Sequence, residues 1–401
     1  MRDWLRYLTA GRPGWMTALM VFCAYMAFVY VPWDFLVKPA AHDEEVWFGI
    51  VLTGYAAKLT EPLHWAIYAA GFYGFLRMRR WMWPWAAAYA GQVAIAMLLY
   101  PWLYVGGFGG FVAGLAGFAP FAFLAAVLWR SREAFESPRP GPRERYGEWA
   151  LVTGASAGIG AEFARALARD GVSCVLSARR ADRLEALAGE LEKTWSIQTR
   201  VVACDLGEAD GADTLAAAVA DLPIAILVNN AGAGYAGRFD QQDPERLRQM
   251  VQLNCVAPVV LTRHLLPQMQ ERGRGAVIVV GSVAGRQALP LHGVYSATKS
   301  FDLLFGEALF VELRDRGIDV LVVEPGPTAT EFQEVAGEVA HPGEPPQDVV
   351  RVALDALGRQ PSVVSGWWNW LRASAATRLP RTIVTFLARD VVAKYTPPDR
   401  R

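Results

Sequence analysis

Residues 148–160 read EWALVTGASAGIG, a short apolar run that passes directly into a glycine-rich turn. The stretch that follows, AEFARALARDG, has the apolar periodicity of a helix and ends at a glycine. In the order strand, turn, helix, Gly154, Gly158 and Gly160 allow the backbone to approach a pyrophosphate, whose charge then lies at the N-terminus of the helix. This stretch therefore predicts a nucleotide-binding turn at the start of an α/β domain.

Apolar, β-rich stretches recur beyond the turn, and helical patterns separate them. They read VSCVLSAR, QTRVVACDL, IAILVNNAG, GAVIVVGS and IDVLVVEPG. Buried strands that alternate with helices are typical of a doubly wound parallel sheet covered by helices on both faces. We expect this α/β domain over residues 147–335.

Several short motifs along the domain fit one known family, in the order in which the family has them. They are TGASAGIG, CDL, NNAG, the asparagine of QLN, the serine of VVGS, YSATK and PGPTAT. Over residues 148–330 the chain resembles the short-chain dehydrogenase/reductase family. The resemblance implies a Rossmann-type fold and hydride transfer between a nicotinamide cofactor and a CH–OH or C=O group. It also implies that copies of the chain pair into a homodimer or homotetramer.

The residues of the YSATK and VVGS motifs fit acid–base chemistry. Tyr295 and Lys299 lie four apart, so a helix presents them on the same face. A positive charge about 4 Å away stabilises a phenolate by roughly 4 kcal/mol at an effective dielectric constant of about 20. Lys299, aided by an oxidised nicotinamide, therefore brings the pKa of Tyr295 toward the range of a general acid–base catalyst. Ser282, at the end of a strand, can hydrogen-bond the substrate oxygen.

The resemblance adds roles that the spacing does not give. It implies that Lys299 also holds the nicotinamide ribose. It further implies that Asn254 anchors a water through which protons reach Lys299. The predicted catalytic set is thus Ser282, Tyr295, Lys299 and Asn254.

The residues after the second strand bear on the choice of cofactor. A carboxylate there would bind the 2′-hydroxyl of NAD, whereas an arginine suits the 2′-phosphate of NADP. The sequence has Ala178 followed by Arg179 and Arg180, which favours NADP(H) over NAD(H). By resemblance, Asp205 contacts the adenine. The full predicted cofactor set is Gly154, Ser156, Gly158, Ile159, Gly160, Arg179, Arg180, Asp205, Asn230, Gly232, Tyr295, Lys299, Pro325, Gly326 and Thr328.

The first third of the chain has a different composition. Charged residues are sparse over 15–129, and tryptophans lie mostly at the ends of apolar runs, where aromatic side chains meet lipid headgroups. Spanning a bilayer takes about 20 apolar residues in a helix. Four runs meet this length, namely 15–37, 46–76, 81–105 and 108–129. Residues 1–130 are therefore predicted to form an all-α transmembrane bundle.

Arginines flank these runs in a pattern that predicts orientation. They precede the first run, separate the second from the third and follow the fourth, at Arg2, Arg6, Arg12, Arg77, Arg79, Arg80, Arg130 and Arg132. Positive residues mark the cytoplasmic side, so both the N-terminus and the α/β domain are expected there, and the membrane is expected to be the inner or plasma membrane if the protein is bacterial. Dividing the second run into two spans would export the domain, which conflicts with its use of a nicotinamide cofactor.

Polar residues interrupt the second run. Lys58, Glu61 and His64 recur at three-residue spacing, which places them on one side of a helix. A lone charge at bilayer depth costs roughly 2.5–3.5 kcal/mol on insertion scales, so these groups need partners. They form either a polar site for a headgroup or a proton, or an ion pair that satisfies itself beside a kink at Pro62.

Small residues recur at the start of the last run. Gly106, Gly110 and Gly114 fall four apart and share one face of the predicted helix. Such a face lets a neighbouring helix approach closely. Packing within the bundle and dimerisation are the two uses that the pattern allows.

Proline and arginine dominate the segment that follows. Pro138, Pro140 and Pro142 disfavour regular helix, so 131–146 is predicted to be a linker. At the other end, 336–401 is predicted to hold a lid region and amphipathic C-terminal helices. In GWWNWLRASAATRLPRTIVTFLARDVVAKY, aromatic and aliphatic residues are interleaved with arginines. This pattern fits a helix lying on anionic lipid, and it equally fits a helix packed on the substrate cleft.

Composition excludes other classes of function. The formal net charge is zero and no basic stripe with interleaved aromatics occurs, which argues against nucleic-acid binding. The 4 cysteines show no CxxC or paired spacing, so neither a zinc site nor a disulfide framework is expected. No metal is predicted.

Together these features predict a membrane-embedded NADP(H)-dependent oxidoreductase. Its substrate is expected to be a hydrophobic or lipid-like ketone, or the corresponding alcohol, and its partner the membrane lipid. Two alternatives stay open. In one, the bundle binds or transports lipid and the α/β domain senses the redox state of NADPH. In the other, the bundle merely tethers a reductase of soluble substrates.

Overall fold

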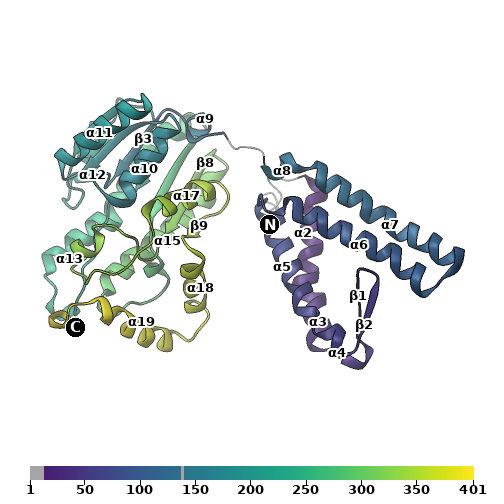
Figure 1. Cartoon of the computed structure of the whole chain (residues 1–401). Coiled ribbons are helices and arrows are strands. Elements are labelled where there is room, and N and C mark those ends of the chain that lie inside the picture. Colours follow the sequence, from purple (N-terminus) through teal and green to yellow (C-terminus); the bar gives the residue numbers. More distant parts are fainter. Residues whose placement is uncertain (1–12, 137–139) are drawn as a thin grey trace. The chain divides into compact units, whose positions relative to one another are not determined.

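The computed structural model describes residues 13–136 and 140–401. Arg2, Arg6, Arg12 and Pro138, which entered the predictions of orientation and linker, lie outside the described residues. Contacts within the chain separate it into two compact units, Met1–Arg139 and Pro140–Arg401 (Figure 1). The division falls inside the segment 131–146.

Within the described part of the first unit, three helices are long and apolar enough to cross a membrane. They are Gly14–Leu36, α6 (Met82–Tyr104) and α7 (Gly107–Arg130). The first of them joins α2 (Gly14–Tyr25), a π-helical turn (Met26–Tyr30) and α3 (Val31–Leu36) without a break. Their positions agree with three of the four predicted runs.

The prediction of a single helix over 46–76 is wrong. The structure places there β1 (Glu44–Trp47), β2 (Ile50–Thr53), α4 (Tyr55–Lys58) and α5 (Glu61–Arg77). The two strands form an antiparallel hairpin whose turn residues, Phe48 and Gly49, have φ of 50° and 86°. Positive φ at both turn residues matches the right-handed twist of a hairpin. Pro62 lies in the first turn of α5, where its missing N–H costs nothing, so the helix begins beside it.

The polar residues of this region face partners on neighbouring segments. Lys58, at the end of α4, lies 3.4 Å from a carboxylate oxygen of Asp43. His64, on α5, lies 3.2 Å from a carboxylate oxygen of Glu45 and stacks on Trp47 with 4.3 Å between ring centroids. These contacts support the interpretation in which the charges satisfy one another.

Three buried carboxyl groups gather behind these pairs. Asp34, Asp43 and Glu61 are each 1% exposed, and one oxygen of each lies within 4.8 Å of the others. The ammonium of Lys38 lies 2.9 Å from Asp34 and 2.8 Å from Asp43. Lys38 therefore offsets part of the negative charge of the cluster.

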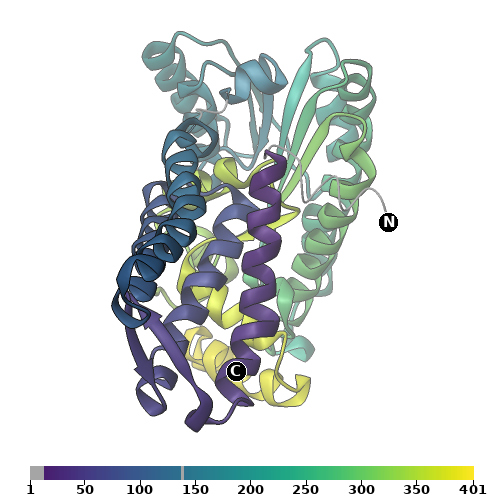
Figure 2. The same cartoon turned by 90° about the vertical axis from the view of Figure 1, so that its right-hand side faces the viewer.

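Glycines set the spacing between α6 and α7, which run side by side in Figure 2. A Cβ added at Gly110 would lie 2.5 Å from the carbonyl oxygen of Pro101, and one at Gly114 would lie 2.6 Å from that of Leu98. A Cβ at Gly106 would meet open space. Gly110 and Gly114 thus pack within the bundle, as one of the two sequence interpretations has it.

The predicted linker is more ordered than expected. It contains α8 (Arg132–Glu136) and α9 (Pro142–Tyr146). Pro142 occupies the first turn of α9, a position that a proline favours because its N–H would be unpaired anyway. Arg145 and Tyr146 then anchor α9 to Asp319 of the second unit, at 2.6 Å and 2.9 Å.

The second unit is built on a parallel sheet of seven strands, in the order β5-β4-β3-β6-β7-β8-β9. The strands are β3 (Trp149–Thr153), β4 (Ser173–Ala178), β5 (Thr199–Ala203), β6 (Ile224–Asn229), β7 (Gly275–Val280), β8 (Ile318–Glu324) and β9 (Ser362–Val364). The first six are the predicted ones, and β9 adds a short edge strand that its three residues were too few to reveal. The expected Rossmann-type α/β fold is thus confirmed.

Helices cover both faces of this sheet (Figure 1). On one face α10 (Gly158–Arg169) contacts α11 (Ala181–Trp195) and α17 (Pro346–Ala356). On the other, α14 (Ala257–Glu271) contacts α12 (Gly211–Ala218), and α15 (Gly293–Arg314) lies along β7 and β8. Because all strands run parallel, the predicted residues that follow them meet at one edge of the sheet.

The α6–α7 packing gives a stability test. Replacing Gly114 with Ala should destabilise the first unit by about 1–3 kcal/mol, because the new methyl group would overlap a backbone carbonyl that cannot move aside. Gly109→Ala is the matched control, since it lies on the same helix and its Cβ would have no neighbour within 4 Å. Thermal unfolding of both full-length variants in nanodiscs measures the difference. Equal midpoints would contradict the close packing.

Candidate active site

In the glycine turn between β3 and α10, no side chain covers the backbone on the side of the cavity. Gly154 and Gly158 have φ of +66° and +56°, a conformation that side chains disfavour. A Cβ at Gly160 would lie 2.4 Å from the carbonyl oxygen of Gly154, so only glycine permits this approach of helix to strand. The first amides of α10 thus adjoin a space that no side chain fills, which suits a phosphate group.

A cavity of about 950 Å³ extends from this turn across the edge of the sheet. Most of the predicted residues line it, namely Gly154, Ser156, Gly158, Ile159, Arg179, Arg180, Asp205, Asn230, Gly232, Ser282, Tyr295, Lys299, Pro325, Gly326 and Thr328. Two predicted residues do not reach it. Gly160 packs behind the turn, and Asn254 is buried below the surface of the cavity.

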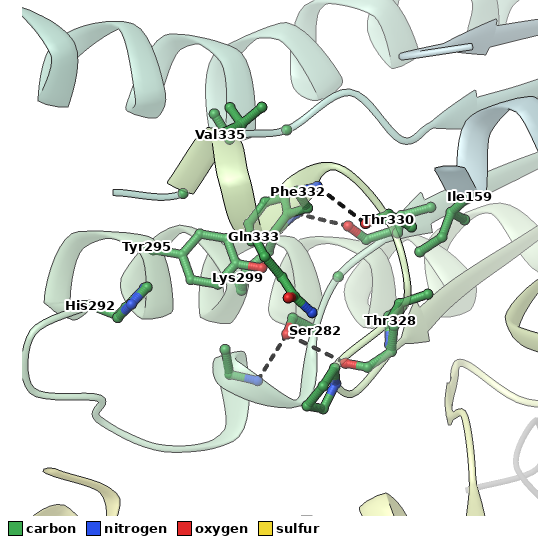
Figure 3. A pocket seen from close by; sticks show the side chains of 18 of the residues that line it. Ile159, Ser282, His292, Tyr295, Lys299, Thr328, Thr330, Phe332, Gln333 and Val335 are labelled. Carbon is green, nitrogen blue, oxygen red and sulfur yellow. Dashed lines mark hydrogen bonds between the residues drawn. The ribbon is translucent and has the colours of Figure 1, made fainter. Parts of the chain in front are cut away.

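Three of the predicted catalytic residues meet at one end of the cavity (Figure 3). Tyr295 and Lys299 project from α15, and Ser282 follows β7. The Ser282 hydroxyl accepts from the amide of Ala284 at 3.1 Å and is within hydrogen-bonding reach of Tyr295. This arrangement brings a hydroxyl donor beside a phenol, as binding and protonation of a carbonyl oxygen require.

Two opposing effects act on Tyr295. Burial raises the pKa of the phenol, while the positive charge of Lys299 and the hydrogen bond from Ser282 lower it. The net direction is upward, because the burial of Tyr295 outweighs the neighbouring charge. The phenol is therefore protonated near neutral pH, which is the state that donates a proton to a carbonyl oxygen.

Lys299 has a partner that the motifs did not reveal. Its ammonium donates to the backbone oxygen of Val280 at 2.8 Å and to the carboxylate of Asp302 at 2.9 Å. Burial lowers the pKa of Lys299, but the charges of Asp302 and Tyr295 more than offset it and the pKa is raised. The only sequence signal for Asp302 is its position three residues after Lys299, on the same helix face.

Asn254 lies in a π-helical turn (Gln252–Val256) between α13 (Pro244–Val251) and α14. Its side-chain oxygen accepts from the amide of Ala233 at 3.0 Å, and its nitrogen donates to Thr298 at 3.0 Å. Both its side-chain groups are therefore bound to the protein, beside Lys299. Such π-helical insertions are frequent at functional sites.

The arginines after β4 lie at the other end of the cavity. The side chain of Arg179 is 71% exposed, and its only ion pair among the described residues is a long one of 3.7 Å to Asp205. Arg180 donates to Ser156 at 3.1 Å and to Glu331 at 2.8 Å. Two guanidinium groups beside the glycine turn fit a phosphate on the cofactor's adenosine ribose.

A lid covers the catalytic end. Phe332, at the start of α16 (Phe332–Ala336), contacts the ring of Tyr295 with 5.4 Å between centroids (Figure 3). Below it, His292 and His341 flank the carboxylate of Glu338 at 3.4 Å and 3.2 Å. Burial lowers the pKa of His292, although Glu338 opposes this. Sequence reasoning missed these residues because they belong to no motif and only the lid brings them together.

The C-terminal helices complete the cavity. Asn369, on α18 (Trp367–Ala376), occupies the space beside Gly326, where a Cβ would lie 2.3 Å from its amide nitrogen. Apolar residues of α18 and of α19 (Arg381–Tyr395) also line the cavity. This position agrees with one of the two interpretations of these helices, in which they pack on the substrate cleft.

Residues 148–339 match the family described as short chain dehydrogenase. The very-long-chain 3-oxoacyl-CoA reductase of Homo sapiens is 32% identical over 241 residues, which cover 59% of this chain and 77% of that reductase. The chain belongs to the short-chain dehydrogenase family. It is therefore an oxidoreductase that acts on CH–OH or C=O groups, as the motifs predicted.

Other members of the short-chain dehydrogenase family are similar over the same part of the chain. The 7beta-hydroxysteroid dehydrogenase of Collinsella aerofaciens is 32% identical over 57% of this chain and 89% of its own length. A solved structure of a 7beta-hydroxysteroid dehydrogenase matches 62% of this chain and 99% of its own, with a TM-score of 0.58 and 29% identity. A short-chain dehydrogenase from Sphingobium yanoikuyae, solved with NADPH, has a TM-score of 0.53 and 31% identity over 58% of this chain and 97% of its own.

The Asp302–Lys299 pair yields a prediction about pH. Asp302 raises the pKa of both Lys299 and Tyr295, so Asp302→Asn should lower both. In the predicted role of general acid, Tyr295 would have to be protonated, so the rate of carbonyl reduction should decline as pH rises through its pKa. The alkaline limb of the pH–rate profile should consequently move to lower pH in the variant.

The matched control is Asp315→Asn, an exposed carboxyl at the C-terminal end of the same helix, which should leave the profile in place. The rate of carbonyl reduction, measured across pH, checks the prediction. A uniform loss of rate with an unmoved limb would mean that Asp302 acts only on packing.

Proposed function

We propose that this chain is a membrane-embedded, NADP(H)-dependent reductase of lipid-like ketones. The observation that carries the proposal is the cavity, which joins the glycine turn, Tyr295 and an apolar end formed by α18 and α19. The same chain carries three helices with the length and composition to cross a membrane. An apolar substrate end on a membrane-anchored dehydrogenase fits a substrate that resides in lipid.

Each of the four predicted catalytic residues has a separate role in the proposed reaction. The glycine turn and the arginines after β4 would hold NADPH, which would supply a hydride to the carbonyl carbon. Ser282 donates a hydrogen bond to the carbonyl oxygen and stabilises the charge that develops on it. Tyr295 transfers its proton to that oxygen, and the ammonium of Lys299 stabilises the phenolate left behind. Lys299 then returns a proton to Tyr295, and Asn254 anchors a water through which a proton reaches Lys299.

The cofactor preference rests on two guanidinium groups. Arg179 is largely exposed and only weakly paired, so it is free to bind a 2′-phosphate. Arg180 reaches Ser156 of the glycine turn and positions its charge beside the first arginine. The related dehydrogenase solved with NADPH supports the same choice.

The substrate class follows from the relatives and the cavity together. Several similar proteins are very-long-chain 3-oxoacyl-CoA reductases, and another is a hydroxysteroid dehydrogenase. These names share a carbonyl or hydroxyl group on a large apolar body. We therefore propose a long-chain 3-oxoacyl compound or a ketone of similar apolar size.

The proposed orientation places the dehydrogenase unit in the cytoplasm, where NADPH is found. Arg77 ends α5 and is followed by Arg79 and Arg80, and Arg130 ends α7 and is followed by Arg132, so both ends carry the positive charge of a cytoplasmic flank. This orientation needs α5 as a fourth crossing. Its 17 residues reach about 25 Å, close to the roughly 30 Å of a hydrocarbon core.

Cofactor choice is tested at Arg179. Arg179→Ala should raise the KM for NADPH by roughly 10- to 150-fold, the loss expected for about 1.5–3 kcal/mol from one charged hydrogen bond, and leave the KM for NADH unchanged. Arg183→Ala is the matched control, because Arg183 pairs with Glu331 but does not line the cavity. An equal effect on both cofactors would contradict the role of Arg179 in phosphate binding.

Substrate class is tested by NADPH oxidation with the full-length protein in nanodiscs. Long-chain 3-oxo compounds should be reduced faster than short, water-soluble ketones, and Tyr295→Phe should lower the rate by roughly 10²–10⁴-fold, the usual contribution of a general acid. If only short ketones were reduced, and the reduction depended on Tyr295, the bundle would merely tether a reductase of soluble substrates. Turnover that survives Tyr295→Phe would contradict the proposed mechanism.

A further inference from the structure

The C-terminal helices α18 and α19 have two apolar faces. The inner face includes Ala373, Val384 and Ala388, which are buried and line the cavity. The outer face carries large side chains that remain exposed. These are Trp367 (76%), Trp368 (52%), Trp370 (56%), Leu371 (43%), Ile383 (51%) and Phe386 (57%). A concentration of exposed apolar side chains on two helices is typical of a site that binds a membrane or another protein.

The charged side chains of the two helices are mostly basic. Residues 367–395 hold Arg372, Arg378, Arg381, Arg389 and Lys394, and their sole acidic residue is Asp390. Asp390 pairs with Arg389 at 2.9 Å, which leaves the other basic side chains to set the sign of the surface. Exposed tryptophans with surrounding arginines suit the headgroup region of an anionic bilayer, where aromatic rings and cations are both favourable.

The same two helices border the cavity. Leu379, Leu387 and Val391 line the cavity and are also 48%, 56% and 49% exposed. Large apolar areas of these side chains are therefore covered by no other part of the protein. An opening of the cavity along α18 and α19 would lie among the exposed aromatic and basic side chains of these helices.

The connection between the units limits how far the dehydrogenase unit can move from a bilayer. The apolar helix α7 ends at Arg130, and α9 of the second unit begins at Pro142. Even fully extended, the segment between them reaches at most about 40 Å. If α7 spans the membrane, as the proposed function requires, the dehydrogenase unit cannot leave the vicinity of the headgroups.

We propose that α18 and α19 dock on the surface of an anionic lipid bilayer, so that the substrate enters the cavity from the membrane. The inference deepens the proposed function and rests on its membrane location. Docking lets the apolar mouth receive a lipid-like ketone without exposing the substrate's chain to water. The basic side chains hold the helices against lipid phosphates, while Ile383 and Phe386 enter the acyl region.

Collision measurements with spin labels test the docking without any turnover. Single nitroxides are placed at Ile383→Cys on the outer face and at Leu387→Cys at the mouth, in full-length protein with Cys204 and Cys255 replaced by Ala. The protein is held in nanodiscs of phosphatidylcholine with phosphatidylglycerol. The matched control is Glu185→Cys on α11, an exposed position remote from these helices. Collision rates with oxygen report lipid, and those with a water-soluble nickel chelate report water.

Docking predicts that labels at 383 and 387 collide more with oxygen than with nickel, whereas the label at 185 shows the opposite. Nickel collisions at 383 equal to those at 185 would overturn the proposal. Low collision rates with both reagents would place these helices against protein and would overturn it as well. A lipid-exposed 383 with a water-exposed 387 would overturn entry from the membrane.

Lipid charge is tested by the same labels. Replacing Arg378, Arg381 and Lys394 with Gln should lower the ratio of oxygen to nickel collisions at 383 several-fold, and so should nanodiscs of phosphatidylcholine alone. No change in either arm would overturn the role of the basic side chains. Because these readouts need no catalysis, a chain that reduces no ketone could still dock, and an active chain could fail to dock.

Discussion

The buried ammonium of Lys299 constrains the catalytic end of the molecule. A charge that is 5% exposed costs several kcal/mol unless it is paired and hydrogen-bonded. Here the carbonyl of Val280 and the carboxylate of Asp302 supply those bonds, so α15 is fixed against the end of β7. That contact also sets Tyr295 beside Ser282. The requirement to satisfy one charge thus determines the geometry of the proton donor.

Close contacts of the backbone also fix helices at other parts of the cavity wall. Gly160 allows α10 to approach Gly154, and Gly326 leaves room for Asn369 of α18. Because α18 is seated on the loop that borders the cofactor end, the C-terminal helices form the far wall of the same cavity. The proposed cofactor site and the proposed substrate site therefore belong to one continuous cavity.

Prediction from the sequence placed residues in the cavity correctly where a polar or conformationally special residue directly follows a periodic apolar strand. Ser282, Asn230 and Pro325 each follow an apolar strand, and parallel strands bring such positions to one edge. It failed over 46–76, where hydropathy alone does not distinguish a hairpin from a helix. It also missed Asp302 and the His292–Glu338–His341 group, whose roles depend on contacts between segments distant from any motif.

By itself, then, the sequence determined the α/β fold and the family, since these follow from periodicity and from motifs with fixed spacing, and it selected candidate site residues of which most line one cavity. It also predicted four membrane-spanning runs, of which three coincide with helices long and apolar enough to cross a membrane. Only the tertiary structure decided how the charges of Lys58, His64 and Lys299 are paired, and which face of α18 and α19 lines the cavity. The reason is physical: burial and pairing depend on distances between segments, and a linear pattern contains no such distances.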